Sequence, residues 1–228
     1  MEDRESDGAE YEEELSTDGW IQWFCSLEGH EFFVEVDEEF IKESFNLYGL
    51  VPKVPHYREA LEMILSFGTP DEDDLQDDKF LELYGEATDL YGMIHARYIL
   101  SPRGLALMRE KYLSGKFGTC PRVMCERQNV IPVGISDVLK TSRVKIFCPR
   151  CQEAYIPKHK YSDVDGAYFG ASFPHILLQS YSDFCIPPLA AEYTPKIYGF
   201  KLYNHKGSKY YEKRSDDLNN DFKKSKIQ

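Results

Sequence analysis

Apolar side chains recur at helical spacing in the first half of the chain. Between residues 75 and 100 they form one stripe, at Phe80, Leu83, Tyr84, Ala87, Leu90, Tyr91, Ile94 and Tyr98. This spacing predicts the longest helix. Gly85 and Gly92, seven residues apart on one face of it, should let another helix approach closely.

Shorter helices are predicted before and after the long one. They cover residues 37–46, 55–68 and 101–114, because acidic residues, a proline and a Ser-Pro pair mark their starts. Residues 20–114 are therefore predicted to form an all-helical domain.

The pattern changes after Gly115. The strand-like runs NVIPVGI and VKIF alternate with frequent Gly and Pro, which predicts a small domain of short antiparallel strands and a following loop over residues 115–170. The stretch DGAYFGASFPHILL should be mostly irregular but packed, and residues 171–205 should form an extended segment. The predicted fold class is α+β.

Both ends of the chain lack apolar periodicity. Residues 1–19 are mostly Glu and Asp, and residues 206–228 are polar with many lysines. Segments of this composition bury too little apolar surface to fold, so we predict a disordered acidic arm and a disordered basic tail.

A loop at residues 69–78 concentrates negative charge. Six carboxylates lie in it: Asp71, Glu72, Asp73, Asp74, Asp77 and Asp78. Two interpretations stay open, a solvated linker and a binding surface for cations or basic partners.

The overall charge narrows the classes of partner. A formal charge of −12 and a pI near 5.0 argue against nucleic acid as a partner. No apolar run approaches the ~20 residues that a membrane span needs, and the N-terminus lacks the pattern of a signal peptide. We therefore expect no membrane partner and a location in the cytoplasm and nucleus.

Four of the six cysteines are clustered. Cys120 and Cys125 are separated by four residues, Cys148 and Cys151 by two, and the pairs by twenty-two. Two such knuckles can bring four thiolates to one tetrahedral centre, which predicts one structural Zn²⁺ per chain; a redox pair would need a different setting. Cys25 and Cys185 have no partner at ligand spacing.

The sequence contains no constellation typical of an enzyme. It has no glycine-rich phosphate loop followed by Lys and Ser/Thr, and none of the motifs of a protein kinase. Its six histidines are scattered, and each is interpreted as structural or exposed. We therefore predict a non-catalytic protein.

The cysteine region resembles a known signature. CPRVMC, five residues, IPVG, nine residues and VKIFCPRC together are similar to the motif of the casein kinase II regulatory beta subunit family. Further blocks in that family's order extend the resemblance over nearly the whole folded chain: WIQWFCSLEGHEFFVEVDEEFI, FNLYGL, VPHYREALEMIL, LYGMIHARYILSPRG, DGAYFGASFPH and KIYGFKLY.

The resemblance implies a non-catalytic subunit of a Ser/Thr kinase. Such a subunit dimerises through its zinc domain and carries a catalytic alpha subunit on each side, as an α2β2 holoenzyme whose substrate choice it modulates. The four clustered cysteines fall on the family's zinc ligands. Contact with the catalytic subunit is implied for the segment with Ile197, Tyr198, Phe200 and Leu202. The residues alone favour a place for Tyr198 and Phe200 in the core of their own domain, and it is the resemblance that favours partner contact.

The resemblance also assigns roles outside these two regions. It implies that the acidic loop binds polyamines or basic regions of protein substrates, and that an early serine is phosphorylated. Ser6 is the nearest candidate, although its third following residue is Ala9 and not an acid.

A different class of function remains as an alternative. Four-cysteine ribbons also occur in nucleic-acid-binding and transcription-assembly modules, which should show a basic stripe with interleaved aromatic residues. Only the lysine-rich tail has a suitable charge, and it lies outside the cysteine region.

Overall fold

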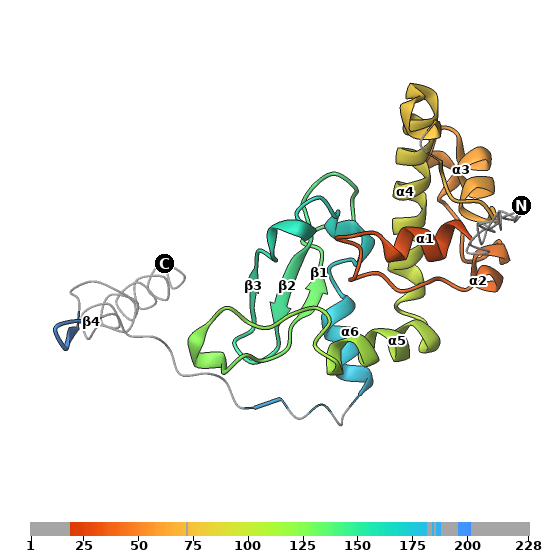
Figure 1. Ribbon diagram of the computed structural model, residues 1–228. Helices are drawn as coiled ribbons and strands as arrows, with labels where there is room; N and C mark the ends of the chain where they lie inside the picture. Colours follow the sequence, from red (N-terminus) through yellow and green to blue (C-terminus); the bar gives the residue numbers. More distant parts are fainter. Residues whose placement is uncertain (1–18, 72, 182–183, 185, 188–195, 202–228) are drawn as a thin grey trace, which may run out of the picture.

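The computed structural model describes residues 19–201 except 72, 182–183, 185 and 188–195. The predicted arm and tail, Ser6, Glu72, Cys185 and Leu202 lie outside the described residues. Figure 1 shows helices grouped around α4 on one side of the molecule and a three-stranded sheet on the other. None of the described helices combines the length and apolarity needed to cross a bilayer.

The helical part matches the pattern of the sequence in its long elements. Its α-helices are α1 (Trp20–Ser26), α2 (Glu38–Lys42), α3 (Tyr57–Ile64), α4 (Asp78–Tyr98) and α5 (Pro102–Leu113), with 3₁₀ turns η1 (Val51–Lys53) and η2 (Asp74–Gln76). The long helix is confirmed, and it begins at Asp78 because the Asp77 side chain accepts the backbone N–H of Lys79 at 3.0 Å. Ser101 caps α5 in the same way, through Gly104 N–H at 3.1 Å.

Side chains of α4 hold the segment that follows α1. The Tyr91 hydroxyl donates to the carbonyl of Val34 at 3.0 Å and accepts the N–H of Val36 at 3.3 Å. One turn later, His95 Nε2 accepts the N–H of Val34 at 3.2 Å. These bonds satisfy backbone groups that would otherwise be buried without partners.

The joint between the helices and the rest of the molecule is Tyr168, in the 3₁₀ turn η5 (Gly166–Tyr168). Its ring lies on Gly92, its hydroxyl donates to Asp89 Oδ1 at 2.8 Å, and its carbonyl accepts Nδ1–H of His95 at 2.8 Å. Three residues spaced by three along one face of α4 thus contact one tyrosine.

The two glycines of α4 therefore have different environments. A Cβ built on Gly92 would lie 2.0 Å from Cδ1 of Tyr168, whereas a Cβ on Gly85 would meet nothing within 4 Å. The close approach expected at both positions occurs at Gly92, and the approaching group is an aromatic ring and not a helix.

The sheet contains β1 (Ile131–Val133), β2 (Lys145–Cys148) and β3 (Glu153–Tyr155) in the order β1-β2-β3. Both pairings are antiparallel, with Ile131 opposite Phe147 and Ile146 opposite Tyr155. The 3₁₀ turn η3 (Val123–Cys125) precedes β1, and the 3₁₀ turn η4 (His159–Tyr161) follows β3. Helices and a small antiparallel sheet together confirm the α+β fold class.

The stretch FPHILLQS departs from the prediction. Residues 173–180 were expected in an irregular or extended region, but they form α6 (Phe173–Ser180), which packs against β1. Pro174 favours the first turn, and Phe173 and Leu177, four residues apart, are both buried. Beyond it, β4 (Lys196–Ile197) and β5 (Phe200–Lys201) form a separate two-stranded hairpin.

The glycine pair gives a test of the Tyr168 joint. Gly92→Ala should destabilise the protein by about 1–3 kcal/mol, because the added methyl overlaps the Tyr168 ring. Gly85→Ala should stabilise it by up to about 1 kcal/mol, because alanine favours a helix where no neighbour is close. Urea unfolding of both variants measures the two values, and equal effects would contradict the described contact.

The buried imidazole predicts acid sensitivity. Burial lowers the pKa of His95 to about 4, against about 6.5 in an unfolded chain. The folded state therefore resists protonation, so stability is full above pH 6.5 and falls by about 3 kcal/mol as the pH drops to 4. In urea unfolding at several pH values, His95→Gln should flatten this dependence, whereas the exposed His175→Gln should retain it.

Candidate functional site

The four clustered cysteines converge on one point. Their Sγ atoms all lie within 4.8 Å of one another, and all four side chains are buried. Cys120 Sγ and Cys151 Sγ are 3.9 Å apart. Four sulfurs at about 2.3 Å from a tetrahedral ion lie about 3.8 Å from each other, so the donor set fits a bound metal ion.

The backbone on both sides of the centre is bent to bring the sulfurs together. Glu126 and Gln152, which directly follow the second cysteine of each pair, have φ values of 52° and 59°. Non-glycine residues seldom adopt this left-handed conformation. Arg150 joins the two knuckles, since its Nη1 donates to the carbonyl of Cys125 at 3.1 Å and contacts Glu126 Oε2 at 3.1 Å.

The thiols of this centre ionise unequally. Burial raises the pKa of Cys125 to about 11 and also raises that of Cys148. At Cys151 burial acts against ionisation, but hydrogen bonds, first among them one from the Tyr155 hydroxyl at 3.3 Å, lower the pKa to about 7. Four thiolates in one buried place would need a countercharge, which a bound metal cation would supply.

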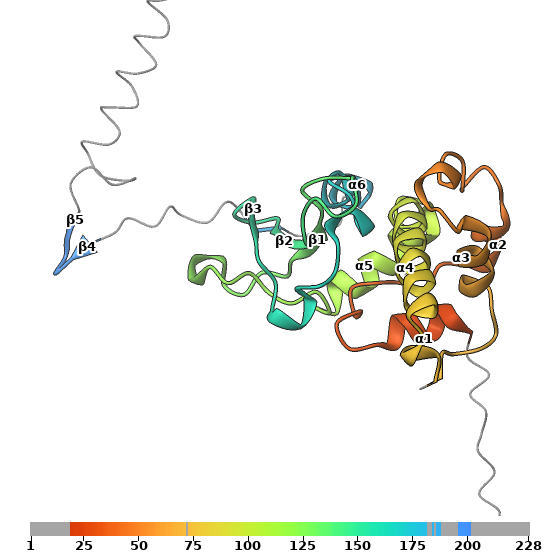
Figure 2. The ribbon, with the colours of Figure 1, turned by 90° about the horizontal axis from the view of Figure 1, so that it is seen from above.

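The β4–β5 hairpin carries three of the four residues assigned to partner binding. Ile197 pairs with Phe200, and the two residues of the turn, Tyr198 and Gly199, have φ values of 48° and 87°. Two positive φ values are typical of a type I′ turn. In Figures 1 and 2 the hairpin lies apart from the sheet and the helices.

The side chains of the hairpin are exposed. Ile197 is 56% exposed, Tyr198 97% and Phe200 79%. They are therefore not part of the core that the described residues form, and the rings of Tyr198 and Phe200 are accessible to a partner. Contact of these three residues with a catalytic subunit stays a prediction.

Comparison with known protein families gives a match over most of the chain. The family model described as casein kinase II regulatory subunit matches residues 19–201. The chain belongs to this family.

Relatives from distant organisms match at similar levels. The casein kinase II subunit beta of Schizosaccharomyces pombe is 47% identical over 203 residues, which cover 88% of this chain and 83% of that protein. The subunit beta of Dictyostelium discoideum is 47% identical over 198 residues, covering 86% and 73%. The subunit beta' of Drosophila melanogaster is 46% identical over 187 residues, covering 81% and 84%. Like the family, this chain is a non-catalytic regulatory subunit.

The acidic loop of this casein kinase II regulatory subunit is partly structural. The backbone N–H of Asp74 donates to Asp71 Oδ1 at 2.8 Å, that of Asp71 donates to Asp74 Oδ2 at 3.2 Å, and Asp77 caps α4. Asp73 and Asp78 are exposed. These two are the described carboxylates whose side chains have no such role in the loop's own hydrogen bonds.

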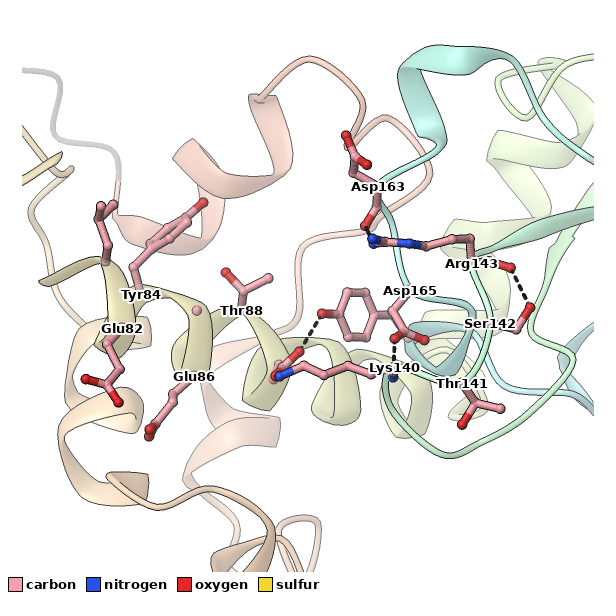
Figure 3. A pocket seen from close by; sticks show the side chains of 14 residues that line it. Glu82, Tyr84, Glu86, Thr88, Lys140, Thr141, Ser142, Arg143, Asp163 and Asp165 are labelled. Atoms are coloured by element: carbon pink, nitrogen blue, oxygen red, sulfur yellow. Dashed lines mark hydrogen bonds and ion pairs between the residues drawn. The ribbon is translucent and has the colours of Figure 1, made fainter. Parts of the chain in front are cut away.

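A polar pocket of about 780 Å³ lies between α4 and the segments 140–143 and 163–168. Figure 3 shows Glu82 and Glu86 of α4 on one side and Lys140, Thr141, Ser142 and Arg143 on the other. Lys140 Nζ contacts Asp89 Oδ2 at 3.0 Å, and its backbone N–H donates to the buried Asp165 at 2.5 Å. Arg143 donates to the carbonyl of Asp163 at 2.5 Å. The Lys140–Asp89 pair therefore joins the two parts of the subunit, whereas the bonds to Asp165 and Asp163 lie within the part that contains the sheet.

Proposed function

We propose that this chain is the zinc-dependent subunit that dimerises, holds a catalytic alpha subunit on each protomer in an α2β2 holoenzyme, and modulates the choice of substrates. The observation that carries the proposal is the exposed hairpin, joined to the same chain as a closed four-cysteine centre. Membership of the family supports the proposal as a whole. Further observations support its separate claims about zinc, dimerisation, the catalytic subunit and basic ligands.

Zinc is the metal that this donor set favours. Four cysteine thiolates around a tetrahedral position are the ligands of structural zinc, and they leave no open position for water or substrate. Cys120, Cys125, Cys148 and Cys151 would hold one ion per chain, which would tie η3 to the ends of β2 and β3. The ion would then stabilise a lobe whose own apolar core is small.

Apolar residues on the surface of the metal lobe support dimerisation there. Val123, two residues before the metal-binding Cys125, is 89% exposed, and Ile156, directly after β3, is 77% exposed. Met124 between the cysteine and Val123 is 41% exposed. A second copy of the lobe would cover this surface, as the resemblance implies.

The hairpin is suited to anchor a partner because its shape is set before binding. The turn at Tyr198 and Gly199 fixes the strand pair, so Tyr198 and Phe200 lose little backbone freedom when they enter a groove. Exposed aromatic side chains of this kind dominate binding energies at protein interfaces. The catalytic alpha subunit would be the partner that takes them.

The exposed carboxylates of the acidic loop support a role for basic ligands. Asp73 and Asp78 would attract basic regions of protein substrates or polyamines, and the negative charge of the whole chain would add to the attraction. A location in both cytoplasm and nucleus and phosphorylation at Ser6 belong to the same proposal.

Loss of one cysteine tests the zinc assignment. Cys148→Ser should lose the single zinc ion and unfold the sheet lobe, because three ligands do not close a structural site. Cys25→Ser changes a thiol that is not part of the cluster and should keep both. Mass-spectrometric metal analysis and thermal melting give the result. Unchanged zinc and melting in Cys148→Ser would exclude the assignment.

Titration with a casein kinase II catalytic subunit tests the hairpin. We expect submicromolar binding of one catalytic chain per zinc-loaded protomer, and loss of at least about 100-fold in affinity when Tyr198 and Phe200 are both changed to Ala. The equally solvated Phe67→Ala, 81% exposed, is the matched control.

A third variant separates the turn from the anchor. Tyr198→Asn keeps a residue that accepts positive φ but removes the aromatic ring, so it should weaken binding of the catalytic subunit if the ring is the anchor. Full binding by Tyr198→Asn would mean that turn shape and not the aromatic ring is recognised. No binding by folded, zinc-containing wild-type protein would overturn the proposed function.

A further inference from the structure

The connection between α2 and α3 exposes large apolar side chains. Phe45 is 85% exposed, Tyr48 83% and Val51 59%. Within the same connection Leu47 is 8% exposed and Leu50 1%. The segment therefore buries one set of apolar residues as its anchor and presents another set to solvent.

The exposed set stands on a fixed backbone. Nη1 of Arg97, near the end of α4, donates to the carbonyl of Asn46 at 2.6 Å, and Nη2 donates to that of Tyr48 at 2.9 Å. The side chain of Asn46 donates to the carbonyl of Phe40 at 3.0 Å. Gly49, with φ of 76°, turns the chain so that Leu50 enters the core. Binding through this surface would thus cost little ordering of the backbone.

The two aromatic residues are neighbours. The N–H of Tyr48 donates to the carbonyl of Phe45 at 3.2 Å, which closes a turn and keeps their Cα atoms within about 7 Å of each other. Adjacent bonds, from Asn46 to Glu43 and from Leu47 to Ser44, follow the same spacing of three. In such turns residues three apart share a side. We call these residues the Phe45–Tyr48 surface.

The segment that carries this surface has a net negative charge. Residues 35–53 contain five carboxylates, Glu35, Asp37, Glu38, Glu39 and Glu43, and two lysines, Lys42 and Lys53. Glu38 is paired with Lys42 at 2.6 Å and Asp37 with Arg103 at 2.9 Å, and the guanidinium of Arg97 is engaged by backbone carbonyls of the turn. The exposed Glu35, Glu39 and Glu43 carry the remaining negative charge. Glu43 Oε2 accepts from the Asn46 side chain at 3.1 Å, which places this carboxylate beside the turn. A complementary ligand would therefore combine apolar side chains with positive charge.

We propose that the Phe45–Tyr48 surface docks protein segments in which apolar residues are flanked by Lys or Arg. If the chain has the proposed function, on which this inference rests, the surface would recruit to the kinase those substrates that carry such segments. It is distinct from the acidic loop: Asp77 caps the first turn of α4, whereas Arg97 supports this surface from its last turn. The two sites lie at opposite ends of a helix roughly 30 Å long.

Peptide binding to the zinc-loaded full chain tests the surface without any kinase. The probe is a fluorescent peptide with two leucines, each flanked by lysines, measured by anisotropy near physiological salt. Changing Phe45 and Tyr48 together to Ser should weaken its binding by about tenfold or more, because aromatic anchors carry much of such an affinity. Phe67→Ser removes an exposed phenylalanine elsewhere and should change it less than twofold.

Changes in charge and in the peptide complete this test. Glu39→Lys should weaken binding, whereas Glu62→Lys, an exposed reversal on α3, should have little effect. A peptide with Ser in place of its leucines should bind wild type about tenfold more weakly than the original peptide does, and this comparison of two peptides requires no folded variant. Equal binding of both peptides would assign recognition to charge alone and overturn the proposal. So would loss of self-association by Phe45→Ser/Tyr48→Ser in sedimentation, since a second copy would then cover the surface.

A second arm uses the reconstituted holoenzyme. A kinase substrate fused to the same peptide should show a severalfold higher KM with the double variant and an unchanged kcat, because docking acts on binding and not on chemistry. Absence of catalytic-subunit binding to wild type would overturn the proposed function while peptide binding persists. An unchanged peptide affinity of the double variant would overturn the docking surface whatever the kinase does.

Discussion

The contact of Tyr168 with α4 is the constraint on which the arrangement of the molecule depends. One tyrosine uses its ring on Gly92, its hydroxyl on Asp89 and its carbonyl on His95. His95 is fully buried and has both ring nitrogens occupied, so it has to be neutral to fold. The helices and the sheet lobe can therefore move little against each other while this contact holds.

The parts for which we propose contacts with other molecules lie away from that joint and apart from one another. The cysteine centre lies in the sheet lobe, the hairpin lies apart from it, and the acidic loop and the Phe45–Tyr48 surface are at the two ends of α4. Spatially separate proposed binding surfaces suit a regulatory subunit, which has no catalytic chemistry of its own.

Each of these surfaces depends on backbone that is fixed before a partner arrives. Left-handed residues follow the cysteine pairs, positive φ values form the turn of the hairpin, and Arg97 fixes the turn below Tyr48. Such conformations cost free energy in the isolated chain, and they reduce the entropy that binding would otherwise lose.

The sequence by itself determined the features that depend on local spacing: the long amphipathic helix, the cysteine pairs and the family to which the chain belongs. It did not determine which apolar residues are buried. Phe45 and Leu47, or Phe173 and Phe200, differ in exposure but not in chemical type, and α6 was hidden in a stretch interrupted by proline and glycine. Only the tertiary structure decided these points, because burial depends on segments that are distant in the sequence. Arg97 of α4 holds the backbone on both sides of Leu47, α6 packs against β1, and Tyr168 packs against Gly92.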